Sequence, residues 1–170
     1  MKKLDAAFFC RDVLEVAPDL IGKVLVRRFT DGTVEHYKIT ETEAYRGEED
    51  LACHASKGRT PRTEVMYHKG GKVYVYLIYG MYQMLNFVTA GENNPQAVLI
   101  RGIEGFEGPG KLTKHLQIDK SFYGEDLAKS ERLWVENDGI LPGYVTGKRV
   151  GIDYAGPWKE KLWRFTLSSK

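Results

Sequence analysis

The sequence contains only two cysteines, Cys10 and Cys53. Two isolated thiols cannot build a disulfide framework, and no Cys/His pair has the close spacing of zinc ligands. We therefore expect reduced thiols, no metal site and no cofactor. A P-loop, an HExxH motif and a Ser-His-Asp spacing are also missing, so the chemistry that these motifs support is not expected.

Long apolar runs are absent as well. No stretch approaches the ~20 residues that a membrane-spanning helix needs, and the N-terminus reaches Asp5 before any apolar segment of a signal peptide. With 170 residues, 42% hydrophobic and 28% charged, the chain fits one globular domain. We expect a soluble cytoplasmic protein without a membrane partner.

The formal net charge of +2 indicates no partner by itself, but the charges are unevenly distributed. Residues 41–50 are mainly acidic, whereas residues 57–72 are mainly basic. An acidic site beside a basic loop suits chemistry on a polyanion, although each segment alone is more often a solvated surface.

Hydrophobic periodicity and turn residues predict short elements along the chain. Residues 4–21 indicate two short helices or one helix broken before Pro18. Residues 23–29 and 33–45 read as strands joined by a tight turn at Asp31–Gly32. Asp50 caps a predicted helical turn at 51–54. Further strands are predicted at 97–101, 133–135, 148–152 and 162–167, and short helices at 111–116 and 125–129.

The stretch from Lys72 to Val88 is aromatic, with four of the ten tyrosines of the chain. Its alternation places Tyr74 and Tyr76 on one face of a strand, and Gly80 favours a bend at 79–82 before a return strand at 84–88. Hairpin tips are normally small and polar, so a bulky tip needs a covering partner or a target. These tyrosines are therefore either core or interface residues, or a wedge that enters a stacked polymer.

Glu43 is the candidate for acid–base chemistry. Alternation along its strand places four side chains on one face: Ile39, Glu41, Glu43 and Tyr45. Glu43 could thus lie in a partly apolar pocket and activate water as a general base, although a strand glutamate is more often exposed. Arg101 ends an apolar strand and serves either a structural ion pair or a site.

A series of motifs runs through nearly the whole chain. They are ETEAYRGEEDLACHA (Glu41 to Ala55), GRTPR (Gly58 to Arg62), VYVYLIYGMY (Val73 to Tyr82), Leu85-Asn86, AVLIR (Ala97 to Arg101), GPGKLT (Gly108 to Thr113), IDKSFYGEDL (Ile118 to Leu127), and RVGIDYAG with Trp158 and RF (Arg149 to Phe165). In order and spacing they resemble the alkyladenine (3-methyladenine) DNA glycosylase family of monofunctional base-excision enzymes.

The resemblance implies an α+β fold, a single compact domain over residues 1–170 with a central, largely antiparallel curved sheet, short flanking helices and a protruding hairpin. It implies an enzyme that flips alkylated or deaminated purines out of duplex DNA and hydrolyses the N-glycosidic bond, leaving an abasic site. The expected substrates are of the 3-methyladenine, 7-methylguanine, hypoxanthine and ethenoadenine class. The expected partner is double-stranded DNA containing damaged purines, bound by a monomer that is nucleoid-associated if bacterial.

Residue roles carry over at the matching positions. The resemblance implies that Glu43 is the general base and that Arg101 helps to fix the attacking water. The implied walls of the base pocket are Tyr45, His54 and Tyr76, with Asn86 crowding the exocyclic amine of guanine. Tyr79 corresponds to the residue that fills the gap left by the flipped nucleotide, with Met81 and Tyr82 bracing neighbouring DNA. Tyr74 keeps a structural role.

Arg59, Arg62 and Lys111 are candidates for phosphate contacts, Lys111 because it follows a glycine-rich segment at a helix start. Extrusion of a base costs a few kcal/mol, and less for a damaged base. Aromatic rings around the extruded base would favour a cationic purine by roughly 0.5 to 2 kcal/mol.

Two other function classes remain open, a non-catalytic binder of damaged DNA and an RNA- or nucleotide-modifying enzyme on a similar fold. Three departures from the family pattern, at Glu48-Glu49, Thr63 and Leu162-Trp163, leave the range of lesions open.

Overall fold

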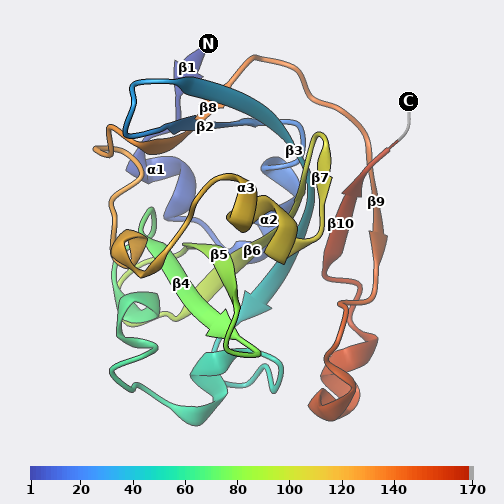
Figure 1. Ribbon diagram of the computed structural model, residues 1–170. Helices are drawn as coiled ribbons and strands as arrows, with labels where there is room; N and C mark the ends of the chain where they lie inside the picture. The colour runs from blue at the N-terminus through green and yellow to red at the C-terminus, as the bar shows by residue number, and fades with distance from the viewer. Residues whose placement is uncertain (169–170) are drawn as a thin grey trace.

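Ten antiparallel strands form the sheet of this protein, and short helices flank it (Figure 1). The computed structural model describes residues 1–168. Its strands are β1 Lys2–Lys3, β2 Val24–Arg28, β3 Val34–Arg46, β4 Val73–Ile78, β5 Tyr82–Val88, β6 Gln96–Ile103, β7 Phe106–Glu107, β8 Leu133–Asn137, β9 Tyr144–Gly147 and β10 Arg164–Leu167. The α-helices are α1 Ala6–Phe9, α2 Val13–Asp19 and α3 Pro109–His115, and 3₁₀ turns cover His54–Lys57, Glu64–Tyr67, Lys120–Phe122 and Asp153–Glu160.

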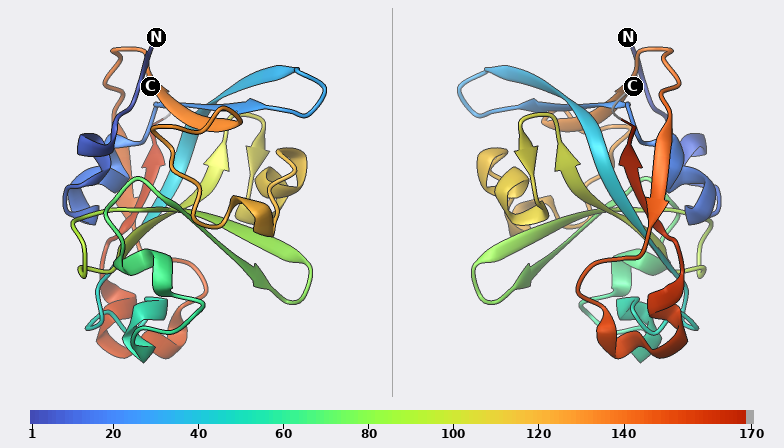
Figure 2. Two further views of the ribbon diagram at one scale, coloured as in Figure 1. Left: turned by 90° about the vertical axis from the view of Figure 1, so that its left-hand side faces the viewer. Right: turned by 90° about the vertical axis from the view of Figure 1, so that its right-hand side faces the viewer.

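The sheet follows the order β1-β8-β2-β3-β6-β5-β4, while β10 pairs with β3 and β9, and β7 pairs with β6. The expected α+β fold, with one compact domain and a largely antiparallel sheet, is confirmed. The sheet twists strongly along this path, and the β4–β5 hairpin extends away from the body (Figure 2). Within residues 1–168 no helix has both the length and the apolar character to cross a bilayer.

One face of the sheet packs against the helices and forms the main core. Phe9 and Val16 of α1 and α2 and Leu112 of α3 belong to one buried cluster with Phe87 and Ile100 of the sheet. The opposite face of β3, β6, β5 and β4 is free of this cluster. It is the face that carries the polar and aromatic side chains of the site described below.

Strand β3 changes its alternation in the middle, which corrects one sequence-based expectation. Ile39 belongs to the main core together with Ala44, whereas Glu43 points to the other face. The pairing of β3 with β6 shifts register between Ile39 and Thr42. A bulge of this kind inserts an unpaired residue and reverses the side-chain direction beyond it. Strict alternation predicted that Ile39 and Glu43 share a face of the strand. In the structure they lie on opposite faces.

Several other predictions need correction. Residues 125–129 are not a helix, because the Asp126 carboxylate accepts the Ala128 N–H in a turn while its backbone pairs with Lys72. Residues 148–152 are not a strand. They form an irregular segment between β9 and the 3₁₀ turn at Asp153–Glu160, in which the Val150 N–H bonds the Glu43 carboxylate instead of a neighbouring strand. The return strand of the hairpin begins at Tyr82 rather than at residue 84. The helical turn expected at 51–54 begins instead at His54, with Asp50 bonding the Ala52 N–H ahead of it.

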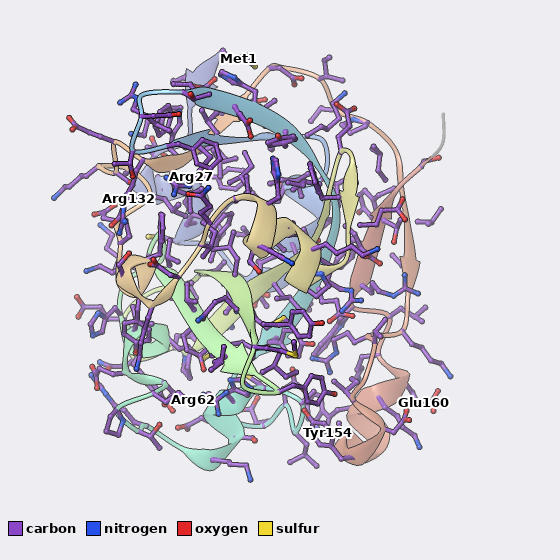
Figure 3. All side chains as sticks on the ribbon, in the orientation of Figure 1. Met1, Arg27, Arg62, Arg132, Tyr154 and Glu160 are labelled. Atoms are coloured by element: carbon purple, nitrogen blue, oxygen red, sulfur yellow. The ribbon has the colours of Figure 1, made fainter. Side chains whose placement is uncertain are left out.

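Three segments distant in sequence lie at one end of the molecule, the lower end in Figure 1: the hairpin tip and the 3₁₀ turns at His54–Lys57 and Asp153–Glu160. Arg62 and Tyr154 are labelled at the same end in Figure 3. This convergence places the acidic strand β3, the basic loop and the tyrosine hairpin around one surface.

Candidate active site

A cavity of about 440 Å³ opens on the free face of the sheet, at the end where the hairpin and the 3₁₀ turns meet. Its lining includes apolar side chains from four strands and from the segment that follows β9. The main lining residues are Tyr45, His54, Arg62, Tyr74, Tyr76, Met84, Asn86, Leu99, Arg101, Val150, Ile152 and Tyr154. A concave, mainly apolar space with a few convergent polar groups is the usual form of a small-molecule or base-binding site.

Glu43 has no exposed surface and does not itself line the cavity, but Tyr45, Arg101 and Val150, which lie next to its carboxylate, do. Its backbone is paired on both sides, to Leu99 of β6 and to Arg164 of β10, so the carboxylate stands on a rigid strand. One oxygen, Oε1, accepts the Tyr45 hydroxyl at 2.7 Å, and Oε2 accepts the Val150 N–H at 2.7 Å. Each oxygen keeps a second lone pair for a further donor.

The protonation of Glu43 is governed by opposing influences. Burial raises the pKa of its carboxyl above the usual range, whereas the charge of Arg101 and the bonds from Tyr45 and Val150 act in the other direction. A carboxyl group with a raised pKa is a stronger base once it is ionised. This environment suits proton abstraction from water.

Arg101 lies between two carboxylates. Its Nε is 3.8 Å from Glu43 Oε2 and 3.5 Å from Glu41 Oε1, and it has no hydrogen-bond partner within the described residues. The two roles considered for Arg101, an ion pair or a site residue, are thus both consistent with its position, since it also lines the cavity.

His54 and two tyrosines form the aromatic wall. The His54 Nδ1 and the Tyr74 hydroxyl are 2.7 Å apart, and the His54 and Tyr76 ring centroids are 4.4 Å apart. Burial, together with the nearby charge of Arg62, lowers the pKa of His54 to about 4, so the ring is neutral at physiological pH. When the Tyr74 hydroxyl donates to Nδ1, the proton of the neutral ring is on Nε2 and is available as a donor.

The Asn86 amide nitrogen donates to two backbone carbonyls, those of Tyr74 and Met84, and the Tyr45 hydroxyl makes one hydrogen bond. The Asn86 amide nitrogen donates to the carbonyl of Tyr74 at 3.2 Å, which leaves its oxygen as the remaining polar atom of the amide. The Tyr45 hydroxyl is held by Glu43, and the guanidinium of Arg149 lies 4.9 Å from the centre of its ring. Both side chains are therefore oriented before any ligand enters.

The hairpin tip exposes large apolar groups next to the cavity. Tyr79 is 85% exposed and Met81 67%, while Tyr82 is 41% exposed and lies against Gly110 at the start of α3. Tyr79 and Gly80 both have positive φ, 53° and 66°, as in the two-residue turns that suit hairpins. Such a backbone is unfavourable for tyrosine, which makes the bulky tip a costly feature.

The predicted basic contacts occupy different places. Arg62 lines the cavity and lies 5.2 Å from the centre of the Tyr76 ring. Arg59 is not in the cavity lining and forms an ion pair with Glu64 at 2.7 Å. Lys111 is exposed in the first turn of α3. Of the three residues predicted to contact phosphates, only Arg62 lines the cavity.

Comparison with known proteins shows which family this chain resembles in sequence. The sequence model described as Methylpurine-DNA glycosylase (MPG) matches residues 7–108 and 105–170. The chain belongs to this family. A relative from Psychrobacter cryohalolentis is 47% identical, with 94% of this chain and 89% of the relative covered, and one from Sodalis glossinidius is 47% identical with 95% of each covered. A third, from Methanocella arvoryzae, is 45% identical over 97% of this chain and 92% of its own. All three are named "Putative 3-methyladenine DNA glycosylase".

Membership in the methylpurine-DNA glycosylase family confirms the resemblance drawn from the motifs and places the chain among DNA glycosylases of base-excision repair. Among residues 1–168, no group of three or more His, Cys, Asp or Glu side chains is arranged to hold a metal ion.

Three residues of the candidate site lie outside the set predicted from the sequence. Tyr74 is buried, which fits its predicted structural role, but its hydroxyl also lies 2.7 Å from His54 Nδ1 and the residue lines the cavity. Its shared face with Tyr76 was the signal that could have identified it. Val150 acts through a backbone N–H, for which a side-chain pattern offers no signal, and Tyr154 reaches the cavity only because the segment after β9 folds back.

Proposed function

We propose that this protein removes alkylated or deaminated purines from duplex DNA by hydrolysing the N-glycosidic bond. The substrate class comprises 3-methyladenine, 7-methylguanine, hypoxanthine and ethenoadenine, and the product is an abasic site. The observation that carries the proposal is the buried Glu43 carboxylate next to the lining of an aromatic cavity, beside Arg101, in a chain that belongs to a DNA glycosylase family.

The reaction requires an extruded nucleotide, because the glycosidic bond is not accessible inside a base stack. Tyr79 enters the space that the nucleotide leaves and thereby offsets part of the cost of unstacking. Its exposure and its position at a projecting tip support this role. Met81 and Tyr82 brace the adjoining DNA, and Arg62, Arg59 and Lys111 contact phosphates.

The extruded purine lies among Tyr45, His54 and Tyr76. A purine alkylated at N3 or N7 is cationic, and aromatic faces attract such a ring by roughly 0.5 to 2 kcal/mol. The neutral state of His54 avoids repulsion of that charge and allows a hydrogen bond to the base edge. Asn86 crowds the position of the guanine amine and disfavours the undamaged base.

Bond cleavage uses a water molecule beside Glu43. The water oxygen attacks the anomeric carbon, one water proton passes to the Glu43 carboxylate, and the glycosidic electron pair leaves with the base. A purine that is cationic through alkylation at N3 or N7 departs as a neutral base, whereas a neutral lesion such as hypoxanthine must also gain a proton as it leaves. Arg101 orients the same water. No lysine of residues 1–168 lines the cavity, which supports a monofunctional enzyme that leaves the strand uncut.

A panel of duplexes carrying single lesions tests the proposal. We expect base release, seen by mass spectrometry, and alkali-labile abasic sites with at least one of 7-methylguanine, hypoxanthine or ethenoadenine. Tight binding without release from any of these lesions would favour a non-catalytic damaged-DNA binder, and activity confined to single strands would favour an RNA- or nucleotide-modifying enzyme.

A further inference from the structure

A second ion pair, between Glu41 and Arg164, lies near Glu43, and neither of its residues lines the cavity. Arg164 faces Glu43 in the register of β10 and β3, and its NH1 donates to Glu41 Oε2 at 3.1 Å. Its Nε donates to the carbonyl of Lys148 at 2.7 Å. Because Val150 follows shortly after Lys148 and bonds Glu43, the pair is connected to Glu43 through backbone as well as through charge.

The sequence makes room for this pair with two glycines. Opposite Arg164 on β9, a Cβ at Gly147 would lie 2.8 Å from the guanidinium NH2. Opposite Glu41 on β6, a Cβ at Gly102 would lie 2.8 Å from the hydroxyl of Thr40 and 3.3 Å from the Glu41 Cβ. A larger residue at either place would displace the pair, so its geometry is built into the strands.

Glu41 competes with Glu43 for the same arginine. Arg101 Nε is slightly closer to Glu41, at 3.5 Å, than to Glu43, at 3.8 Å. The ionisable groups around Glu43 come from five segments, β3, β4, β6, β10 and the segment after β9: Glu41, Tyr45, Tyr76, Arg101, Arg164 and Arg149. Of these, Glu41 and Arg164 are paired with each other, and neither side chain forms a hydrogen bond with the Glu43 carboxylate within the described residues. The charge of Glu41 also opposes the ionisation of Glu43 directly.

We propose that Glu41 and Arg164 are positioning residues that set how strongly Arg101 favours the ionised form of Glu43. Glu41 holds Arg101 midway between two carboxylates, and Arg164 neutralises Glu41 so that it does not draw Arg101 away. The inference rests on the proposed role of Glu43 as general base. It predicts that removing the charge of Glu41 and removing the charge of Arg164, each in its own variant, shift the titration of Glu43 in opposite directions.

The variants Glu41→Gln and Arg164→Gln test this. Their side chains are 21% and 30% exposed, so neither change leaves a fully buried charge. With Glu41→Gln, Arg101 has one carboxylate left and Glu43 ionises at lower pH. With Arg164→Gln, Glu41 is unneutralised and Glu43 ionises at higher pH. Asp19→Asn and Arg11→Gln make the same charge changes in the ion pair between Asp19 of α2 and Arg11, which lies between α1 and α2. Neither residue lines the cavity, so these variants serve as matched controls.

The first measurement is the carbon-13 titration of glutamate-labelled protein, with Glu43→Gln to assign the resonance. It needs no substrate. The second is the single-turnover rate of base release against pH. In the acid limb we expect Glu41→Gln to be about threefold faster and Arg164→Gln about threefold slower than the unaltered enzyme, with all rates converging at higher pH.

Shifts in the same direction, or no shift of the Glu43 resonance in either variant, would overturn the proposal, as would equal shifts in the controls. If Arg164→Gln fails to fold, Arg164→Lys replaces it. Arg164→Lys retains the positive charge, so we expect its Glu43 carboxyl to titrate as in the unaltered protein. A Glu43 carboxyl in Glu41→Gln that ionises at the same pH as in Arg164→Lys would then overturn the proposal. Should no lesion be excised at all, the proposed function fails, while the carboxyl titration continues to test the coupling on its own.

Discussion

At the scale of single residues, Glu43 shows how a site can cost stability. Its raised pKa means that the folded protein holds the proton more tightly than the unfolded chain does. Below the ordinary glutamate pKa both states are protonated and the shift has no effect on stability. As the pH rises, the unfolded chain ionises first, so the free energy of unfolding decreases.

Glu43→Gln is therefore expected to stabilise the protein at neutral pH by about 0.5–2 kcal/mol while abolishing excision. The gain should disappear near pH 4, where the carboxyl is protonated in both states. Urea denaturation at several pH values measures this. If Glu43→Gln is less stable than the unaltered protein at pH 7, the favourable contacts of the carboxylate with Arg101, Tyr45 and Val150 exceed the cost of burying its charge.

Tyr45→Phe removes the hydroxyl that bonds Glu43 Oε1 and keeps the ring of the pocket wall. Loss of this donor raises the pKa of Glu43 further. We expect the single-turnover rate to fall by about tenfold in the acid limb and by less at higher pH, with lesion binding nearly unchanged. Tyr76→Phe is the matched control, because the Tyr76 hydroxyl has no hydrogen bond to Glu43 among residues 1–168. Equal pH profiles for the two variants would contradict the assigned role.

At the scale of elements, the β4–β5 hairpin places a strained tyrosine where glycine or asparagine is normal. Tyr79→Gly should relieve the positive φ and raise the free energy of unfolding by about 1 kcal/mol. It should also lower excision, because the gap left by the flipped nucleotide is no longer filled. Thermal unfolding and single-turnover kinetics on one duplex measure both effects. Loss of stability, or unchanged excision, would remove the argument for a wedge.

Local pattern predicted the paired elements well and the irregular ones poorly. The turn at Asp31–Gly32 and the alternation around Tyr74 and Tyr76 depend on neighbours in sequence, and both elements formed as expected. The bulge at Thr40 could not be read from the sequence, because it is set by pairing with β6 and not by β3 alone.

The candidate site was only partly predictable for the same reason. Residue type and strand alternation single out Glu43, whereas the roles predicted for His54 and Tyr76 follow from the family resemblance. Their assembly with the irregular segment at Arg149 and Val150 depends on contacts between residues 105 and 107 positions apart in sequence.

At the scale of the whole molecule, one buried ion pair connects the segments of the site. Arg149 and Asp50 have no side-chain exposure, and their atoms are 2.6 Å apart. Arg149 also donates to the carbonyls of Ala44 and Trp158, and Asp50 accepts the Arg46 N–H. The pair thus joins the end of β3, the loop before His54 and the segment after β9.

Arg149→Met is expected to cost about 3–5 kcal/mol of stability, since it leaves the Asp50 charge buried without its partner. The double variant Asp50→Asn with Arg149→Met should recover most of that loss, because no charge remains buried. Denaturant unfolding measures both, with Arg11→Met in an exposed pair expected to cost less than about 1 kcal/mol. If the double variant is no more stable than the single one, charge is not what the pair contributes.

The central claim is that Glu43 activates the water that releases an extruded purine. The direct measurement compares single-turnover base release and equilibrium binding for the unaltered protein and Glu43→Gln, on one duplex with a single hypoxanthine or 7-methylguanine. We predict release only by the unaltered protein, with binding affinities equal within a few-fold. Release at equal rates by both proteins, or by neither, would contradict the account.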